Sequence, residues 1–130
     1  SRVAFGKALG QHQQIQKFVF DSAAEIQQSR MLTLHAAHKI DQGDEARVEI
    51  GLIKVVGAAM LHNVIDRAIQ VHGALGYSTD KPLPHMLLQA RWARFADGAD
   101  EVHQMRIAQR SIKAWTDTGS TSRATGDLPI

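Results

Sequence analysis

The stretch FADGADEVHQ, Phe95 to Gln104, gathers side chains that could move a proton. Three acids and a histidine surround a glycine: Asp97, Gly98, Asp100, Glu101 and His103. A fixed carboxylate can act as a general base on a weakly acidic C–H when it lies within hydrogen-bond reach of the proton. The same spacing suits a helix start, with Asp97 as N-cap and Asp100 three residues later. The residues alone leave both alternatives open.

Two further segments could approach a phosphate. The first twelve residues carry Arg2, Lys7 and His12, and an arginine fork binds phosphate through paired hydrogen bonds. Phe5-Gly6 predicts a turn before the first helix. The glycines of HGALGY would let another group come close to the backbone. Each segment also has a structural alternative, a solvated helix entrance for the first and a C-cap at Gly73 for the second. HGALGY lacks the preceding strand and the full GxGxxG of a dinucleotide fingerprint.

Composition excludes several other classes of site and partner. The chain of 130 residues has no cysteine, which removes disulfides, thiolate metal sites and a cysteine nucleophile. His35 and His38 could face one metal, but no acidic partner stands at a suitable spacing, and we expect no metal site. The 15 basic and 13 acidic residues are interspersed, which predicts no nucleic-acid partner. The apolar stretch Gly51–Leu61 is interrupted by Lys54 and is too short for a membrane span.

Helices must position these candidate residues. Apolar residues recur at helical spacing over 12–40, 45–71, about 83–95 and from the DGADE segment to about 115. A turn at 41–44 separates the first two helices, with Asp44 as a candidate cap, and HGALGYSTDKPLP forms the one extended loop. The pattern predicts an all-α fold, an antiparallel up-and-down four-helix bundle over 1–115. Residues 116–130 read as a polar tail.

The three candidate segments together resemble the C-terminal helical domain of the acyl-CoA dehydrogenases. The family's R-x-x-F-G-K-x-L and HQ motifs match Arg2 to Gln13. The family's Q-x-x-G-G-x-G-[YF] motif matches QVHGALGY, except that Ala74 stands in place of the second glycine. STDKPLPHMLLQAR is similar to the family's next loop and helix. The usual base lies in Y-E-G-T, where this chain has Ala96-Asp97-Gly98-Ala99. The run ADGADEVH resembles the branch that, in animals, is fused to a phosphotransferase-like domain.

This resemblance implies a flavoprotein oxidoreductase that converts acyl-CoA to trans-2-enoyl-CoA in fatty acid β-oxidation. Asp97 would remove the α-proton, and Gly98 would line the thioester site. Gln70, Gly73 and Ala74 would contact the FAD of a neighbouring subunit, and Glu101 replaces a glutamine that usually holds the cofactor. The implied FAD-binding residues are Arg2, Phe5, His12, Gln13, Gln70, Gly73, Ala74, Ala99 and Glu101.

The resemblance also implies partners. An N-terminal helical domain and a middle β domain would complete the enzyme, so we expect this chain to be a fragment that is inactive alone. A homodimer or tetramer and an electron-transfer flavoprotein as electron acceptor are implied as well. We expect a cytoplasmic location in a bacterium, and the mitochondrial matrix or peroxisome in a eukaryote. The alternative is a non-catalytic helical interaction module derived from this family.

Overall fold

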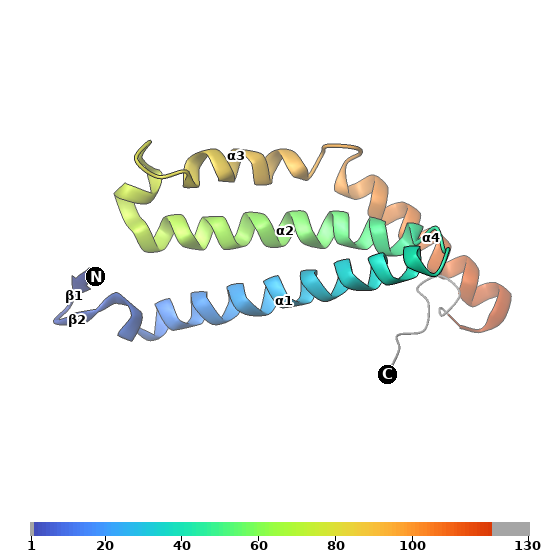
Figure 1. Cartoon of the computed structure of the whole chain (residues 1–130), viewed down its shortest axis with the longest axis horizontal. Coiled ribbons are helices and arrows are strands. Elements are labelled where there is room, and N and C mark those ends of the chain that lie inside the picture. The colour runs from blue at the N-terminus through green and yellow to red at the C-terminus, as the bar shows by residue number, and fades with distance from the viewer. Residues whose placement is uncertain (1, 121–130) are drawn as a thin grey trace.

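The computed structural model describes residues 2–120, which form four α-helices preceded by a small hairpin (Figure 1). The all-α prediction is confirmed. The sequence did not predict the two strands of two residues each that pair antiparallel near the N-terminus, because they are too short to leave an alternating pattern. The elements are β1 Val3–Ala4, β2 Lys7–Ala8, η1 Leu9–Gln11, α1 Gln13–Asp41, α2 Arg47–His72, η2 Gly73–Tyr77, α3 Leu83–Ala93 and α4 Asp100–Thr118.

Helix α4 reaches three residues past the end predicted for the bundle. It runs to Thr118 and ends at Gly119, which takes the left-handed conformation usual for the residue after a helix. Most of the predicted tail, residues 121–130, lies outside the described residues.

Helix α2 is the centre of the fold. Helices α1 and α3 lie on opposite sides of α2, and α4 packs on its first half, while α1, α3 and α4 make few contacts with one another (Figure 1). Small residues on α2 permit this close packing: a Cβ at Gly51 would lie 3.0 Å from Ile107 Cδ1 of α4. The other three helices therefore surround α2 without closing on one another. The apolar core is made of small and medium side chains, Ala36, Ala46, Val48, Ala58, Ile65 and Ala90.

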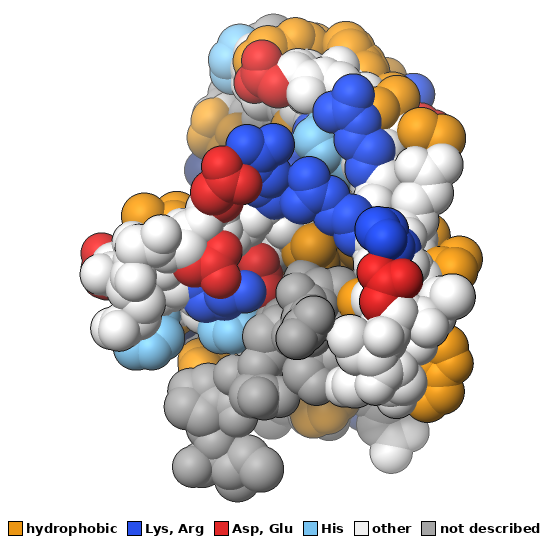
Figure 2. All heavy atoms as spheres, turned by 90° about the vertical axis from the view of Figure 1, so that its right-hand side faces the viewer, with side chains coloured by type: hydrophobic (Ala, Val, Ile, Leu, Met, Phe, Trp, Pro, Cys, Tyr) orange, Lys and Arg blue, Asp and Glu red, His pale blue; other side chains and the backbone are white. Residues whose placement is uncertain are grey.

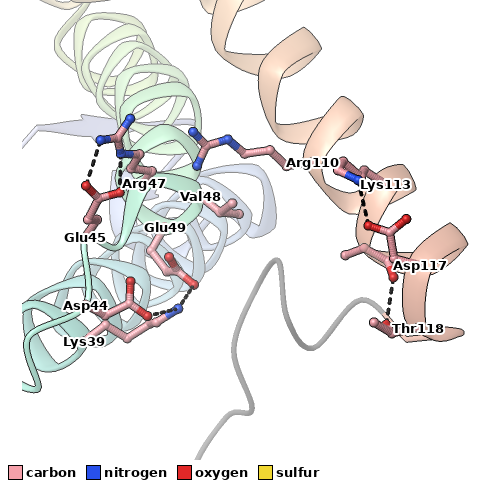
Figure 3. A pocket seen from close by; sticks show the side chains of 11 residues that line it. Lys39, Asp44, Glu45, Arg47, Val48, Glu49, Arg110, Lys113, Asp117 and Thr118 are labelled. Atoms are coloured by element: carbon pink, nitrogen blue, oxygen red, sulfur yellow. Dashed lines mark hydrogen bonds and ion pairs between the residues drawn. The ribbon is translucent and has the colours of Figure 1, made fainter.

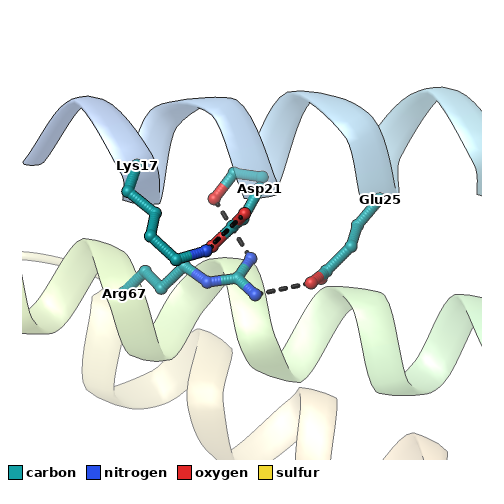
Figure 4. A network of polar contacts seen from close by, with 5 residues as sticks. Lys17, Asp21, Glu25 and Arg67 are labelled. Atoms are coloured by element: carbon teal, nitrogen blue, oxygen red, sulfur yellow. Dashed lines mark hydrogen bonds and ion pairs between the residues drawn. The ribbon is translucent and has the colours of Figure 1, made fainter. Parts of the chain in front are cut away.

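Ion pairs fix how α1 lies along α2. At one end, Lys39 Nζ donates to the buried Glu49 carboxylate at 2.9 Å. This hydrogen bond raises the pKa of Lys39 above its ordinary value, against the opposing effect of burial. At the other end, Arg67 reaches from α2 to Glu25 of α1, beside the Lys17–Asp21 pair (Figure 4). A slip of one helix along the other would separate both pairs.

The prediction that Asp44 caps α2 was wrong. The N-cap is Ala46, which has φ +47° and no side-chain cap. Asp44 instead accepts a hydrogen bond from the Ala46 N–H at 2.8 Å, and this bond, together with Lys39, lowers the pKa of the Asp44 carboxyl. The aspartate therefore shapes the turn before the helix, two residues earlier than a cap would stand.

The C-terminal end of α2 follows the sequence prediction. Gly73 is the C-cap with φ +62°. Gly76 lies in η2 against the end of α2, where a Cβ would come within 2.8 Å of the Ile69 carbonyl oxygen. Only glycine permits that approach of the two backbones.

The segment Arg47–Tyr77 is long and apolar enough to cross a membrane by length and composition alone. It includes the stretch Gly51–Leu61, which alone is too short for a membrane span, and extends beyond it at both ends. A helix that must bury its sides against three neighbours acquires the same composition. The absence of a membrane span stays a prediction.

The packing around α2 can be tested at Ala90, which is fully buried on α3. Ala90→Leu should lower the free energy of unfolding by about 1–3 kcal/mol, because the added atoms have no space between the helices. Ala108→Leu, at an exposed position of α4, should stay within about 0.5 kcal/mol of the parent. Urea unfolding followed by circular dichroism measures both. Equal stability for the two variants would contradict the close α2–α3 contact.

Candidate functional site

Asp97 lies in the turn between α3 and α4. Two consecutive residues of this turn are left-handed, Asp97 with φ +53° and Gly98 with φ +106°. Aspartate is one of the few residues other than glycine that adopt this conformation readily. The Asp97 side chain is exposed and has no hydrogen bond or ion pair within residues 2–120. The turn thus presents a free carboxylate.

The capping alternative for Asp97 was wrong. Helix α4 begins at Asp100, and its N-cap is Ala99, with extended backbone and no side-chain cap. Asp97 stands two residues before that cap, so the carboxylate is not occupied with the first amides of the helix.

Asp100 holds the turn from beneath. Its side chain is only 2% exposed and accepts hydrogen bonds from Arg94 Nε at 2.8 Å and Lys54 Nζ at 3.2 Å. Burial alone would raise the pKa of the Asp100 carboxyl, but the hydrogen bonds and charges of Arg94 and Lys54 outweigh it and hold the pKa below its usual value. Asp100 is therefore a fixed, paired anion and does not serve as an alternative base.

Lys54 and His103 contact the backbone of the same turn. Lys54 Nζ also donates to the Gly98 carbonyl oxygen at 2.6 Å. His103 Nε2 hydrogen-bonds to the Asp97 carbonyl oxygen at 3.3 Å, which requires the proton on that nitrogen. A Cβ at Gly98 would lie 3.2 Å from His103 Nε2, so glycine lets the turn rest on the imidazole. His103, a possible base by its type, supports the turn instead.

A shallow groove of about 290 Å³ opens beside Asp97, between α2 and α3. Most of its lining residues are apolar, and Lys54 and Asp97 are the charged residues among them. Trp92, which is 56% exposed, gives the groove an aromatic side. The lining residues are Lys54, Gly57, Ala58, Leu61, Trp92, Ala93, Ala96 and Asp97. An apolar chain could lie here next to a base.

The N-terminal hairpin displays an aromatic ring. Phe5 and Gly6 are its central residues, both with positive φ, as predicted for a turn at this place. Phe5 is 98% exposed, and its ring meets the His12 ring edge-on with centroids 6.3 Å apart. His12 Nε2 in turn donates to the Ala4 carbonyl oxygen at 3.0 Å. A strained, exposed phenylalanine held by its neighbours indicates a contact surface.

The hairpin lies before the start of α1, at the end of the molecule where α2 finishes (Figure 1). Arg2 Nη1 lies 3.2 Å from the place where a Cβ of Gly73 would be. The absence of that Cβ lets the guanidinium lie over the backbone, with the exposed Gln70 and Ala74 on either side of Gly73 in the chain. One end of the domain therefore holds a cation, an exposed ring and an open backbone.

The predicted cofactor residues fall into two groups. Arg2, Phe5, His12, Gln13, Gln70, Gly73 and Ala74 belong to the hairpin end, whereas Ala99 and Glu101 belong to the turn with Asp97. Lys54, which contacts that turn, lies 19 residues before Gly73, the C-cap of α2. At 1.5 Å per residue, the distance between them along the helix is about 28 Å. The structure does not bring the two groups together within one chain.

A charged pocket of about 360 Å³ lies at the opposite end, where the α1–α2 turn faces α4 (Figure 3). Lysine and arginine side chains form a band over this end, with acids among them (Figure 2). The charged lining residues are Lys39, Arg47, Arg110 and Lys113 and, of opposite sign, Asp44, Glu45, Glu49 and Asp117. The balance of charge does not favour an ionic ligand.

His35 and His38 line an apolar groove along α1. Among the described residues, no group of three or more His, Cys, Asp or Glu side chains is arranged to hold a metal ion.

Comparison with known proteins identifies the family of this chain. The family model described as "Acyl-CoA dehydrogenase, C-terminal domain" matches residues 1–112. The chain belongs to the acyl-CoA dehydrogenase family. Mouse acyl-CoA dehydrogenase family member 10 is 46% identical over 115 residues, which are 87% of this chain and 11% of that protein.

Solved structures share the fold. Butyryl-CoA dehydrogenase from Megasphaera elsdenii superposes with a TM-score of 0.77 at 30% identity, over 81% of this chain and 27% of that one. The FAD complex of PigA gives 0.80 at 27% identity, over 85% of this chain and 29% of that one. The chain thus spans less than a third of the length of these proteins.

Sequence reasoning missed the cluster beneath the turn. Lys54 was noticed only as an interruption of an apolar stretch, and Arg94 was not considered. The signal was present nonetheless, because a lysine in the middle of an apolar helix needs a buried acid as partner. The buried acid is Asp100, at the start of α4.

Asp100→Asn should lower the free energy of unfolding by about 3 kcal/mol, because Lys54 loses its buried partner. Asp117→Asn removes an exposed pair with Lys113 and should cost less than about 1 kcal/mol. Since the folded state lowers the pKa of Asp100, its contribution is present at neutral pH and is lost as the pH falls below about 4. Urea unfolding at pH 7 and pH 3 tests this, and a difference between parent and Asp100→Asn that is equal at both pH values would contradict it.

Proposed function

We propose that this chain is the C-terminal domain of a longer FAD-dependent acyl-CoA dehydrogenase, to which it supplies the base, part of the flavin site and a subunit interface. The observation that carries the proposal is the free Asp97 carboxylate, held in a left-handed turn beside an apolar groove. The related butyryl-CoA dehydrogenase supports an acyl-CoA as substrate class.

Asp97 would take the α-proton of the acyl thioester. This C–H is a weak acid, so the base must be fixed at about 2.6–3.2 Å from the proton-bearing atom or act through one water. The backbone conformation of the turn would hold the base in a fixed position. Gly98, which has no side chain, would leave space for the thioester beside it. The groove along Ala58, Leu61 and Trp92 offers apolar surface for the acyl chain. Covering the turn with substrate would strip water from the carboxylate and strengthen it as a base.

The residues of the hairpin end fit a flavin dinucleotide. Arg2 can pair with a pyrophosphate, Phe5 offers an exposed ring face, and Gly73 leaves the backbone open. When bound, FAD supplies the acceptor for the β-hydride. Because Arg2 lies on Gly73, both belong to one half-site, and the turn with Ala99 and Glu101 belongs to the other. A cofactor between two chains would meet the hairpin of one chain and the turn of its neighbour. The structure of PigA with FAD supports this cofactor.

The base can be tested with Asp97→Asn in the full-length, FAD-loaded protein. Asparagine tolerates the left-handed backbone as aspartate does, so the turn is preserved while the basic carboxylate is removed. Turnover with an acyl-CoA should fall about a hundredfold or more, with flavin content and melting temperature nearly unchanged.

Asp117→Asn, an exposed acid at the far end of α4, should keep the parent rate. Parent-like turnover in Asp97→Asn would place the base elsewhere. A full-length protein that binds no flavin, judged by its absorbance spectrum, would favour the non-catalytic helical module.

The exposed face of α1 would form the subunit interface of a homodimer or tetramer. A groove of about 640 Å³ runs there between α1 and α2 and is almost wholly apolar. Met31 and Leu34 are 62% and 55% exposed, and Val19 and Phe20 extend the face toward the hairpin. Exposed apolar area of this extent favours a protein partner. We also propose an electron-transfer flavoprotein as acceptor, and the cytoplasm, mitochondrial matrix or peroxisome as location.

Leu34→Glu should shift the isolated chain toward monomer in sedimentation velocity, because a carboxylate would enter the apolar interface. Leu88→Glu, on α3 at the other side of α2 and 70% exposed, is the control and should leave the association unchanged. We expect the isolated chain to bind FAD weakly, because the middle β domain that would help to enclose the cofactor is not part of it. A parent chain that is monomeric at all concentrations, or a sub-micromolar affinity for FAD, would contradict this proposal.

A further inference from the structure

We infer that Lys54 is a positioning residue for Asp97: it holds the Asp97–Gly98 turn in its left-handed conformation from beneath, together with Asp100 and Arg94. The catalytic part of this inference rests on the function proposed above. The conformational part does not, since it concerns only contacts within this chain.

The turn has no support from its own side chains. Asp97 has two soft backbone angles in a sparsely populated region, and its side chain makes no polar contact within residues 2–120. Gly98 has no side chain, and glycine restricts its own backbone conformation less than any other residue type. The conformation must therefore come from groups outside the turn, and two side-chain contacts to its carbonyls supply it, one from Lys54 and one from His103.

Lys54 is the group that ties the turn to the rest of the fold. Its ammonium donates to the Gly98 carbonyl oxygen at 2.6 Å and to Asp100 Oδ1 at 3.2 Å. Asp100 Oδ2 accepts from Arg94 Nε at 2.8 Å, and the Asp100 N–H donates back to the Arg94 carbonyl oxygen at 3.0 Å. Since Arg94 is the C-cap of α3 and Asp100 the first residue of α4, Lys54 on α2 is linked to both ends of the turn through Asp100.

The position of the Asp97 carboxylate follows from this backbone. A short side chain in a fixed turn can reach only a small region, and proton transfer tolerates little displacement. A misplacement of about 1 Å can cost on the order of a hundredfold in rate. Loss of the Lys54 contact to Gly98 should thus reduce the rate of proton removal more than it changes substrate binding.

The chain offers a matched control at Lys39. Lys39 and Lys54 have the same side-chain exposure, 17%, and each pairs with a nearly buried carboxylate, Glu49 or Asp100. Lys39 lies at the other side of α2 and contacts neither the turn nor the groove beside Asp97. Lys39→Met removes the ion pairs with Glu49 and Asp44, and Lys54→Met removes the pair with Asp100. A purely structural role therefore predicts an effect from Lys39→Met at least as large as that from Lys54→Met.

The first experiment needs no cofactor. In the 130-residue chain, ¹⁵N relaxation should give backbone order parameters for residues 97–99 near the rigid value of about 0.85, in the parent and in Lys39→Met. In Lys54→Met they should fall below about 0.6, and the Asp100 amide should lose protection from hydrogen exchange. If Lys54→Met does not fold, Lys54→Gln serves instead. Its side chain stays polar, but it carries no charge to pair with Asp100 and is one bond too short for the Lys54 contact with Gly98. A turn that stays rigid in the folded variant overturns the inference, whatever the reaction.

The second experiment measures the reaction in the full-length flavoprotein. Rapid mixing with an acyl-CoA should show flavin reduction about a hundredfold slower in Lys54→Met, with KM nearly unchanged and the parent rate kept in Lys39→Met. Lys54→Arg should recover part of the rate, because a guanidinium can still donate to both oxygens. A rate lost in Asp97→Asn but kept in Lys54→Met overturns the positioning role. A rate kept in Asp97→Asn overturns the proposed base instead, and the order parameters still decide whether Lys54 holds the turn.

Discussion

Helix α2 has to pack against three helices at once, and this requirement determines most of its sequence. Because α1, α3 and α4 hardly touch one another, each must find its apolar contacts on α2. Apolar residues therefore run around much of the helix, and small ones, such as Gly51 and Ala58, lie where a neighbour comes closest. The same composition makes Arg47–Tyr77 long and apolar enough to cross a membrane by length and composition alone.

The few charged residues of α2 that lie in its interfaces decide how the neighbours are placed. Apolar packing has little directional preference, whereas a charge shielded from water needs its partner at one position. Glu49 pairs with Lys39 and Arg67 with Glu25, and together they define the register of α1. Lys54 pairs with Asp100 and thereby sets where α4 begins. In our inference, the Lys54–Asp100 pair also positions the turn that carries the Asp97 carboxylate.

The sequence predicted the four helices and the breaks between them because periodicity and glycine or proline signals are local. It also identified the turn at Phe5–Gly6 and the C-cap at Gly73, where the backbone itself demands particular residues. The caps at Asp44 and Asp97 were wrong for a physical reason. Residue type shows that an aspartate favours a helix start, but the start itself is set by tertiary contacts, here those of Asp100 with α2 and α3. The role of Lys54 depends on a partner 46 residues away, which no local pattern encodes.

The candidate residues lie at the two ends of α2, and the domain also exposes a large apolar face on α1. Under the proposed function, Arg2 and Gly73 belong to one half of the flavin site and the turn with Asp97 to the other. Along α2, Gly73 lies about 28 Å from Lys54, which contacts that turn. A rigid helix cannot bend to bring them together, so a ligand that needs both must be met by two chains. The apolar face of α1, with Met31 and Leu34, gives such chains a surface on which to associate. Because one long helix packs against three neighbours, the candidate residues lie at its two separate ends, where other chains can contact them.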